Sequence, residues 1–221
     1  MGISDLVLQR RCVGCGYPNA HLCVTCQRTL TSQINPQRVR TSPVPTYAAA
    51  TYDGVCRQVV LAAKRTGQRV FIDRLATLLS LSLRCLLVEE LTQRAADKCG
   101  TVGLVPIHSG SATRRSAGQD LVASMLKLAV RRMRSPPGHV AIVDVLVRRP
   151  ALVNQKELNR DQRRHNVRGR FVARSDRRLT GMPVVLVDDV MTTGSTLAAA
   201  RTALEAAGVH VAGATVAVFR P

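Results

Sequence analysis

The clearest structural signal in this 221-residue chain is the run Val184-Val185-Leu186-Val187-Asp188-Asp189-Val190-Met191-Thr192-Thr193-Gly194-Ser195-Thr196. Its apolar start, Pro183 to Val187, lacks the alternation of a strand with one wet face. Such a run is typical of a parallel strand that is covered on both faces. A helical pattern follows from Ser195 to about Ala207, and Gly208 stands where glycine commonly ends a helix. The run therefore predicts one strand-to-helix unit of a parallel α/β sheet.

Patterns elsewhere in the chain predict the same alternation of helices and strands. The segment Tyr52–Lys64 is expected to begin a helix, with Asp53 as its candidate N-cap. Further helices are expected over Val70–Arg94 and Ser116–Met133. Strands are expected over Val102–Ile107, Val140–Val147 and Val209–Val218. The expected fold is a mostly parallel sheet flanked by helices, and ligands bind beyond the carboxyl ends of such strands. This directs attention to the loops that follow Ile107 and Val187.

Two acids and a hydroxyl-rich loop follow the apolar run. The carboxylates of Asp188 and Asp189 can accept hydrogen bonds from the vicinal hydroxyls of a ribose, or help to hold a hydrated Mg²⁺. The loop Thr192–Thr196 supplies hydroxyls, a permissive glycine and the free amides of a helix N-terminus, which together can cradle a phosphate. An ordinary capped turn would explain Ser195 or Thr196 alone. It does not explain two adjacent acids and four hydroxyl residues around a glycine, so we expect a sugar-phosphate site.

Four of the seven cysteines form a cluster near the N-terminus, as Cys12-x-x-Cys15 and Cys23-x-x-Cys26. Two such pairs offer the tetrahedral four-sulfur set that suits a structural zinc ion. No apolar run in this segment is long enough for a core, so a metal is expected to hold it together. Free thiols are the alternative, and a redox dithiol is a weaker one because neither pair lies in a βαβ context.

The chain is expected to divide into a four-cysteine module at 1–32, a linker at 33–46 and an α/β domain at 47–221. The linker holds Pro36, Pro43 and Pro45 among polar residues. No secretory signal and no uncharged apolar stretch of membrane-spanning length occur in the sequence. We therefore expect a cytoplasmic protein with no membrane insertion.

The net charge of +18 favours polyanionic partners, including single-stranded or double-stranded DNA. The alternative is that the arginine excess reflects only a GC-rich genome. Of the 32 basic residues, only four are lysine: Lys64, Lys98, Lys127 and Lys156. The low aromatic content, 3%, leaves little material for stacking single-stranded bases.

The run from Val184 to Thr196 resembles the phosphoribosyl-diphosphate (PRPP) binding motif of type I phosphoribosyltransferases. The resemblance implies that Asp188 and Asp189 contact the ribose hydroxyls of PRPP. It also implies that the 5′-phosphate is held by the loop residues Met191, Thr192, Thr193, Gly194, Ser195 and Thr196. The fold implied is the type I phosphoribosyltransferase-like sheet.

The wider chain resembles the ComF family, also described as competence-related or GntX-like proteins. The four-cysteine module, the PRPP motif and two further segments carry this resemblance over nearly the whole chain. One segment is Gln155-x-x-Leu158-x-x-x-x-Arg163-x-x-Asn166-Val167-x-Gly169-x-Phe171, and the other is Tyr52-Asp53-Gly54 with Lys64-x-x-Gly67. The family's Arg-Gly-rich loop after Pro106 has only a loose match, Thr113–Asp120.

These resemblances imply a transferase in which Mg²⁺-bound PRPP loses pyrophosphate while a nucleophile attacks C1 of its ribose. The basic stretch Arg148–Arg168 suits a lid over the diphosphate, with Arg163 as the expected ligand and Lys64 as a second candidate. The alternative for that stretch is a solvated basic helix. In the 6-oxopurine enzymes a third acid stands where this chain has Thr192, which argues against hypoxanthine-guanine salvage.

Two functions stay open on this evidence. The first is transfer of a phosphoribosyl group to an unidentified acceptor. The second is a non-catalytic, zinc-containing accessory module of DNA uptake that binds PRPP, a nucleotide or DNA and has a protein partner in the competence machinery.

Overall fold

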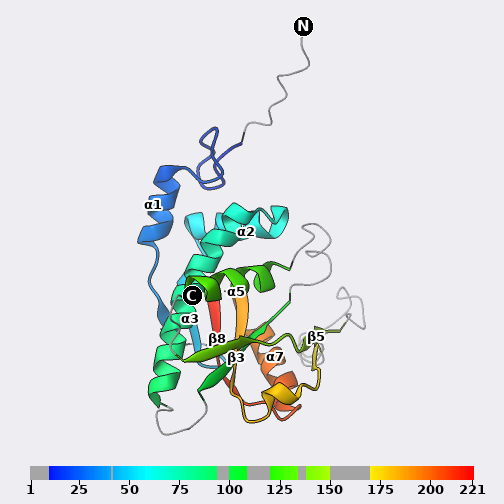
Figure 1. The fold of residues 1–221 in the computed structure, drawn as a ribbon. Coiled ribbons are helices and arrows are strands. Elements are labelled where there is room, and N and C mark those ends of the chain that lie inside the picture. The colour runs from blue at the N-terminus through cyan, green and yellow to red at the C-terminus, as the bar shows by residue number, and fades with distance from the viewer. Residues whose placement is uncertain (1–9, 41, 94–99, 109–119, 134–137, 150–169) are drawn as a thin grey trace.

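The computed structural model describes residues 10–40, 42–93, 100–108, 120–133, 138–149 and 170–221, and the statements below concern these residues (Figure 1). The helices are α1 Val24–Ser32, α2 Gly54–Thr66, α3 Arg69–Gln93, α5 Leu121–Arg132, α7 Ser195–Glu205 and the short 3₁₀ helix η1 Arg177–Leu179. The strands are β1 Gln37–Val39, β2 Thr46–Thr51, β3 Thr101–Pro106, β4 His139–Ile142, β5 Leu146–Arg148, β6 Phe171–Ala173, β7 Val184–Met191 and β8 Val211–Phe219.

Within the described ranges, six strands form one sheet in the order β1-β2-β8-β7-β3-β4. The edge strand β1 runs antiparallel to β2, and every other neighbouring pair in this sheet is parallel. Strands β5 and β6 form a separate antiparallel pair. The expected mostly parallel α/β sheet flanked by helices is confirmed.

The sheet is covered on both faces, and each face has its own apolar core. On one face, Val185 and Val187 of β7 pack with the helices α2, α3 and α5. On the other face, Val184 and Leu186 pack with α7 and with the β5–β6 pair. Every one of these four side chains is fully buried, which explains why β7 is apolar without alternation. Among the described helices, none is both long and apolar enough to cross a membrane.

The N-terminal cysteine segment packs on the helical face of the domain (Figure 1). Leu22 and Leu30 are buried in the same core cluster as α2 and α3, together with Cys12 and Cys26. Arg74 of α3 also donates a 3.0 Å hydrogen bond to the side-chain oxygen of Gln27 in α1. The segment has no core of its own, and its apolar side chains join the core of the domain.

Several element boundaries differ from the prediction. The expected strand Val140–Val147 is divided between β4 and β5, because the chain leaves the main sheet after Ile142 and pairs next with β6. Strand β7 continues to Met191, because β8 stays paired with it that far. The two acids therefore lie within the strand rather than after it. Part of the expected linker forms β1, while the division at 1–32, 33–46 and 47–221 stays a prediction.

Candidate active site

The position of the site follows from two neighbouring strands whose following helices pack on opposite faces of the sheet. Strands β3 and β7 are adjacent and parallel, with Pro106 opposite Val187. The helix after β3, α5, packs on the α3 face, while the helix after β7, α7, packs on the opposite face. In open α/β sheets, ligands bind beyond the carboxyl ends of the strands where the connections diverge in this way. The loops after β3 and β7 are therefore the expected walls of a ligand site.

The acid pair lies at this carboxyl edge. Asp189 is buried, with its side chain 6% exposed, and its Oδ2 lies 2.8 Å from Nζ of Lys64 in the last turn of α2. Asp188 is half-buried, and one of its carboxylate oxygens accepts the backbone N–H of Asp189 at 2.8 Å. The structure thus brings together two acids and a lysine that are more than a hundred residues apart in the chain.

Burial and neighbouring charges shift the pKa values of Asp188 and Lys64, and both are raised. Burial and the charge of Asp189 raise the pKa of Asp188 well above its ordinary value, with Lys64 opposing the rise. Burial lowers the pKa of Lys64, but the charge and hydrogen bond of Asp189 more than offset this, so the lysine pKa is raised. Lys64 is therefore a firmly charged cation beside the acid pair.

The predicted phosphate loop follows directly on the acid pair. Met191 is buried, whereas Thr192, Thr193 and Ser195 are exposed and Thr196 is half-buried. Gly194 has φ +71° and is the N-cap residue of α7. A Cβ at this glycine would lie 2.6 Å from Cδ of Pro43, so no residue with a side chain fits at this position. The result is a tight turn with accessible hydroxyls at the start of an 11-residue helix.

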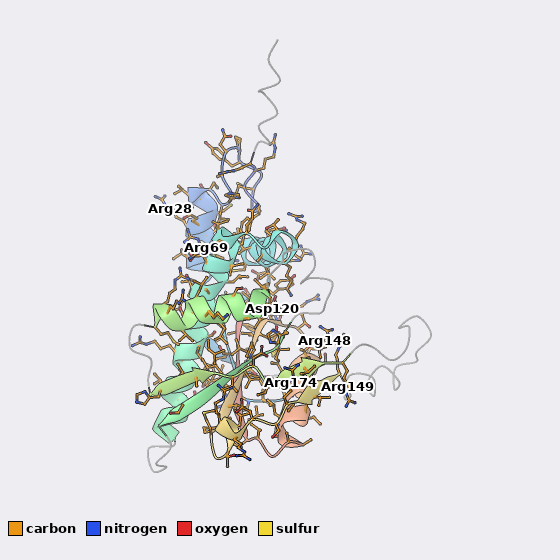
Figure 2. All side chains as sticks on the ribbon, turned by 45° about the vertical axis from the view of Figure 1, so that its right-hand side comes forward. Arg28, Arg69, Asp120, Arg148, Arg149 and Arg174 are labelled. Atoms are coloured by element: carbon orange, nitrogen blue, oxygen red, sulfur yellow. The ribbon has the colours of Figure 1, made fainter. Side chains whose placement is uncertain are left out.

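Part of the predicted lid is described and most of it is not. Arg163 lies outside the described residues, as does the match to the Arg-Gly-rich loop except for Asp120. Arg148 ends β5, and Figure 2 shows it with Arg149 and Arg174 at the β5–β6 pair. Burial and the charge of Arg170 lower the pKa of Arg148, and the charge of Asp188 opposes this. Asp188 is thus close enough to Arg148 to act on it electrostatically.

A second polar cluster at the same edge was not singled out from the sequence. His108 follows β3, and its Nδ1 lies 3.0 Å from Oδ2 of Asp120 while its Nε2 lies 2.6 Å from Oδ1 of Asp144. The hydrogen bond to Asp120 raises the pKa of His108, burial opposes this, and Asp144 raises it further. The loop after Ile107 was expected to matter, and its first residue is this histidine. The two acids come from separate segments, so spacing gave no sign of them.

The four predicted metal ligands come together near the N-terminus. One sulfur from each of Cys12, Cys15, Cys23 and Cys26 lies within 4.8 Å of the others, and the Sγ atoms of Cys15 and Cys23 are 3.6 Å apart. A tetrahedral zinc site with bonds of about 2.3 Å has sulfur–sulfur edges of about 3.8 Å, so the donor set fits zinc. Burial raises the pKa of the Cys12 thiol, but backbone hydrogen bonds led by Cys23 bring it down to about 6.

Comparison with known proteins agrees with this geometry. Residues 126–221 match the family model described as the phosphoribosyl transferase domain. A search of curated proteins finds no significant match. The matched region contains β7, the acid pair, the Gly194 turn and α7. Lys64, His108 and the cysteine cluster lie before it. The match covers less than half of the chain, so it shows a likeness to the phosphoribosyl transferase domain over residues 126–221.

Proposed function

We propose that the chain binds Mg²⁺-PRPP at the acid pair and transfers its phosphoribosyl group to an acceptor. The observation that carries the proposal is a single strand-to-helix connection that holds both Asp188–Asp189 and the Gly194 turn. Acceptors for ribose hydroxyls and donors for a 5′-phosphate are thereby spaced along one rigid segment. The match of residues 126–221 to the phosphoribosyl transferase domain supports the same assignment.

In this proposal the chain acts mainly by positioning. Asp188, which is half-buried, accepts hydrogen bonds from the ribose hydroxyls. The Thr192–Thr196 loop holds the 5′-phosphate, so that C1 of the ribose faces the loops after β3 and β7. Lys64 neutralises the buried Asp189 and keeps the pair from repelling the anionic substrate. The carboxylate oxygens of the pair fit a hydrated Mg²⁺, which when bound would neutralise charge on the departing pyrophosphate.

Further parts of the proposal concern residues outside this geometry. Arg163 is the proposed diphosphate ligand from the Arg148–Arg168 stretch, because a guanidinium pairs bidentately with phosphate. Arg148 at the base of that stretch supports the idea, since its pKa responds to the charge of Asp188. The proposed relatives are ComF proteins, on the cysteine module and the motifs together. The acceptor is unidentified: adenine, orotate, uracil, another base or a non-base acceptor fits the proposal, while Thr192 argues against hypoxanthine and guanine.

We also propose a structural zinc ion at the four cysteines. The support is the convergence of four sulfurs within 4.8 Å of one another, with Cys12 and Cys26 buried against the core of α2 and α3. A metal there would tie the cysteine segment to the helical face of the domain.

Nucleic-acid binding is the second candidate function, and the net charge of +18 favours it. Exposed arginines occur on well-separated elements (Figure 2). Arg28 lies in α1 and Arg69 begins α3, while Arg149 and Arg174 lie at the β5–β6 pair. In this version the chain is an accessory module of DNA uptake. Its DNA affinity would fall linearly with salt on a log-log plot, and undetectable or salt-insensitive binding would exclude it.

Calorimetry of PRPP binding with Mg²⁺ is the direct test of the first proposal. We expect saturable binding at one site per chain, and release of pyrophosphate when the correct base or amine from a panel is added. Absence of PRPP binding by the intact protein would refute the enzyme function. Binding without pyrophosphate release across the panel would favour the accessory module.

A further inference from the structure

His108 is held between two carboxylates, one at each ring nitrogen. The distances are 3.0 Å from Nδ1 to Asp120 and 2.6 Å from Nε2 to Asp144. A carboxylate can only accept, so each ring nitrogen must carry a hydrogen for both contacts to form. The geometry therefore favours the imidazolium, in which both ring nitrogens are donors. The two acids lie at opposite ring nitrogens, which also rules out one metal ion shared by all three side chains.

The two carboxylates differ in how firmly they are held. The Asp120 side chain is 11% exposed, and its Oδ1 also accepts the backbone N–H of Ala123 at 3.0 Å as the N-cap of α5. The Asp144 side chain is 64% exposed, in the connection between β4 and β5. Asp120 is thus a fixed partner, whereas Asp144, whose side chain lies mostly in solvent, is the more easily displaced of the two.

The placement of His108 points to the ligand site. The N–H of Ile107 donates to the carbonyl of Val187 at 2.8 Å, so β3 and β7 remain paired up to the residue before Asp188. His108 therefore follows on the strand next to the acid pair, at the edge where the α5 and α7 connections diverge. Its Nε2–H is a charged donor at a site that the proposed function assigns to a phosphorylated ligand.

We propose that Asp144 is a built-in competitor, whose carboxylate occupies His108 Nε2 until a phosphoryl oxygen of the ligand displaces it. The inference rests on the proposed function for the identity of the ligand. Asp120 orients the ring and sustains its charge, His108 supplies the anion contact, and Asp144 weakens binding by holding that contact in the unliganded protein. Loss of His108 should weaken anion binding and loss of Asp144 should strengthen it, opposite effects that a merely structural cluster would not produce.

The test is titration of inorganic pyrophosphate, and separately of PRPP with Mg²⁺, into the wild type and matched variants. Asp144→Asn should tighten pyrophosphate binding about three- to tenfold, because a competing exposed carboxylate is removed. His108→Gln should weaken it about tenfold, since a charged donor becomes neutral. In the double variant, Asp144→Asn should bring no gain. Glu205→Gln, at the far end of α7, removes the same charge and controls for net charge.

A spectroscopic readout keeps this test separate from that of the proposed function. Nitrogen NMR of the His108 ring should show a shift of Nε2 when pyrophosphate is added, larger in Asp144→Asn than in the wild type. Unchanged His108 resonances, or pyrophosphate affinity in Asp144→Asn equal to that of Glu205→Gln, would overturn the inference even where PRPP binds. If PRPP does not bind while pyrophosphate shifts Nε2, the proposed function fails and the anion contact at His108 stands.

Discussion

Nζ of Lys64 lies 2.8 Å from Oδ2 of Asp189, which joins the end of α2 to the buried acid of β7. The side chain of Asp189 is 6% exposed and that of Lys64 is 39% exposed, so the lysine is the more exposed partner of the pair. From the sequence, Lys64 was a candidate for the diphosphate. In the structure it faces the acid pair, and contact with the diphosphate stays a prediction.

Replacing this lysine should cost stability. Lys64→Met would leave Asp189 buried without its counter-charge, and we expect the free energy of unfolding at pH 7 to fall by roughly 1–2 kcal/mol. The value lies between those of surface and buried pairs because Lys64 is partly exposed. Urea denaturation measures it, with Arg65→Met as the control at an exposed neighbour on α2. Equal losses in the two variants would show that the pair contributes nothing specific.

The Gly194 turn should tolerate no side chain. In Gly194→Ala, the left-handed φ of +71° adds strain, and the new Cβ would meet Cδ of Pro43 at 2.6 Å. We expect a loss of at least about 2 kcal/mol in unfolding free energy, together with weaker PRPP binding.

Gly208→Ala is the matched control for that turn. Gly208 has φ +76° but nothing within 4 Å of its Cβ position, so only the backbone strain of about 1 kcal/mol applies. Chemical denaturation of both variants separates the two causes. If Gly194→Ala costs no more than Gly208→Ala, the close approach of Pro43 carries no weight.

Long, strongly patterned elements were predictable from the sequence. The helix expected over Val70–Arg94 is observed as α3, Arg69–Gln93, and the strand expected over Val102–Ile107 is observed as β3, Thr101–Pro106. In both, burial follows from local pattern alone. The sequence Thr46–Thr51 gave no such sign, because three of its residues are alanines with little preference for strands. It becomes β2 through parallel pairing with β8 and burial against α3.

The candidate site was predictable only where its residues are consecutive. The acid pair and the Gly194 turn form one run, so their proximity is covalent. His108, Asp120 and Asp144 lie in three separate segments that only the tertiary fold brings together. The sequence also placed the end of the strand at Val187, because it shows local polarity and not that β8 stays paired with β7 to Met191.

Neutralising Asp188 should weaken PRPP binding and raise the stability of the folded protein. Its pKa is raised by burial and by Asp189, so the charged form is disfavoured in the folded protein. The unfolded chain loses this proton near the ordinary value of 3.8, and stability is lost as the pH rises from there through the folded pKa. Asp188→Asn should therefore be more stable than the wild type at neutral pH, yet bind PRPP about 10- to 100-fold more weakly.

Denaturation at pH 4 and pH 7 and calorimetry with PRPP check both halves of this trade. The stability gain should be larger at pH 7. Glu205→Gln serves again as the charge-matched control and should change neither property appreciably. A variant that binds PRPP as well as the wild type would remove Asp188 from the site.

The cysteine cluster should hold one zinc ion per chain. Elemental analysis should find one equivalent in the wild type and much less in Cys15→Ser, while Cys85→Ser, outside the cluster, should keep it. Chelation should lower the melting temperature by at least about 5 °C, because Cys12 and Cys26 anchor the segment to the core. Metal-free protein that melts at the same temperature would contradict the zinc proposal.

His108 should make stability depend on pH in a defined window. Its pKa is raised above 6.5, chiefly by the hydrogen bond to Asp120, with burial opposing and Asp144 adding. The stability it contributes is therefore fully present below pH 6.5 and is lost as the pH rises through the folded pKa. His108→Gln should thus be less stable than the wild type at pH 5.5 by on the order of 1 kcal/mol, and nearly equal to it at high pH.

Denaturation curves across pH 5 to 9 measure this difference, with His139→Gln on the exposed edge of β4 as the control. A gap between wild type and His108→Gln that stays constant with pH would show that the ring acts by packing and not by its charge.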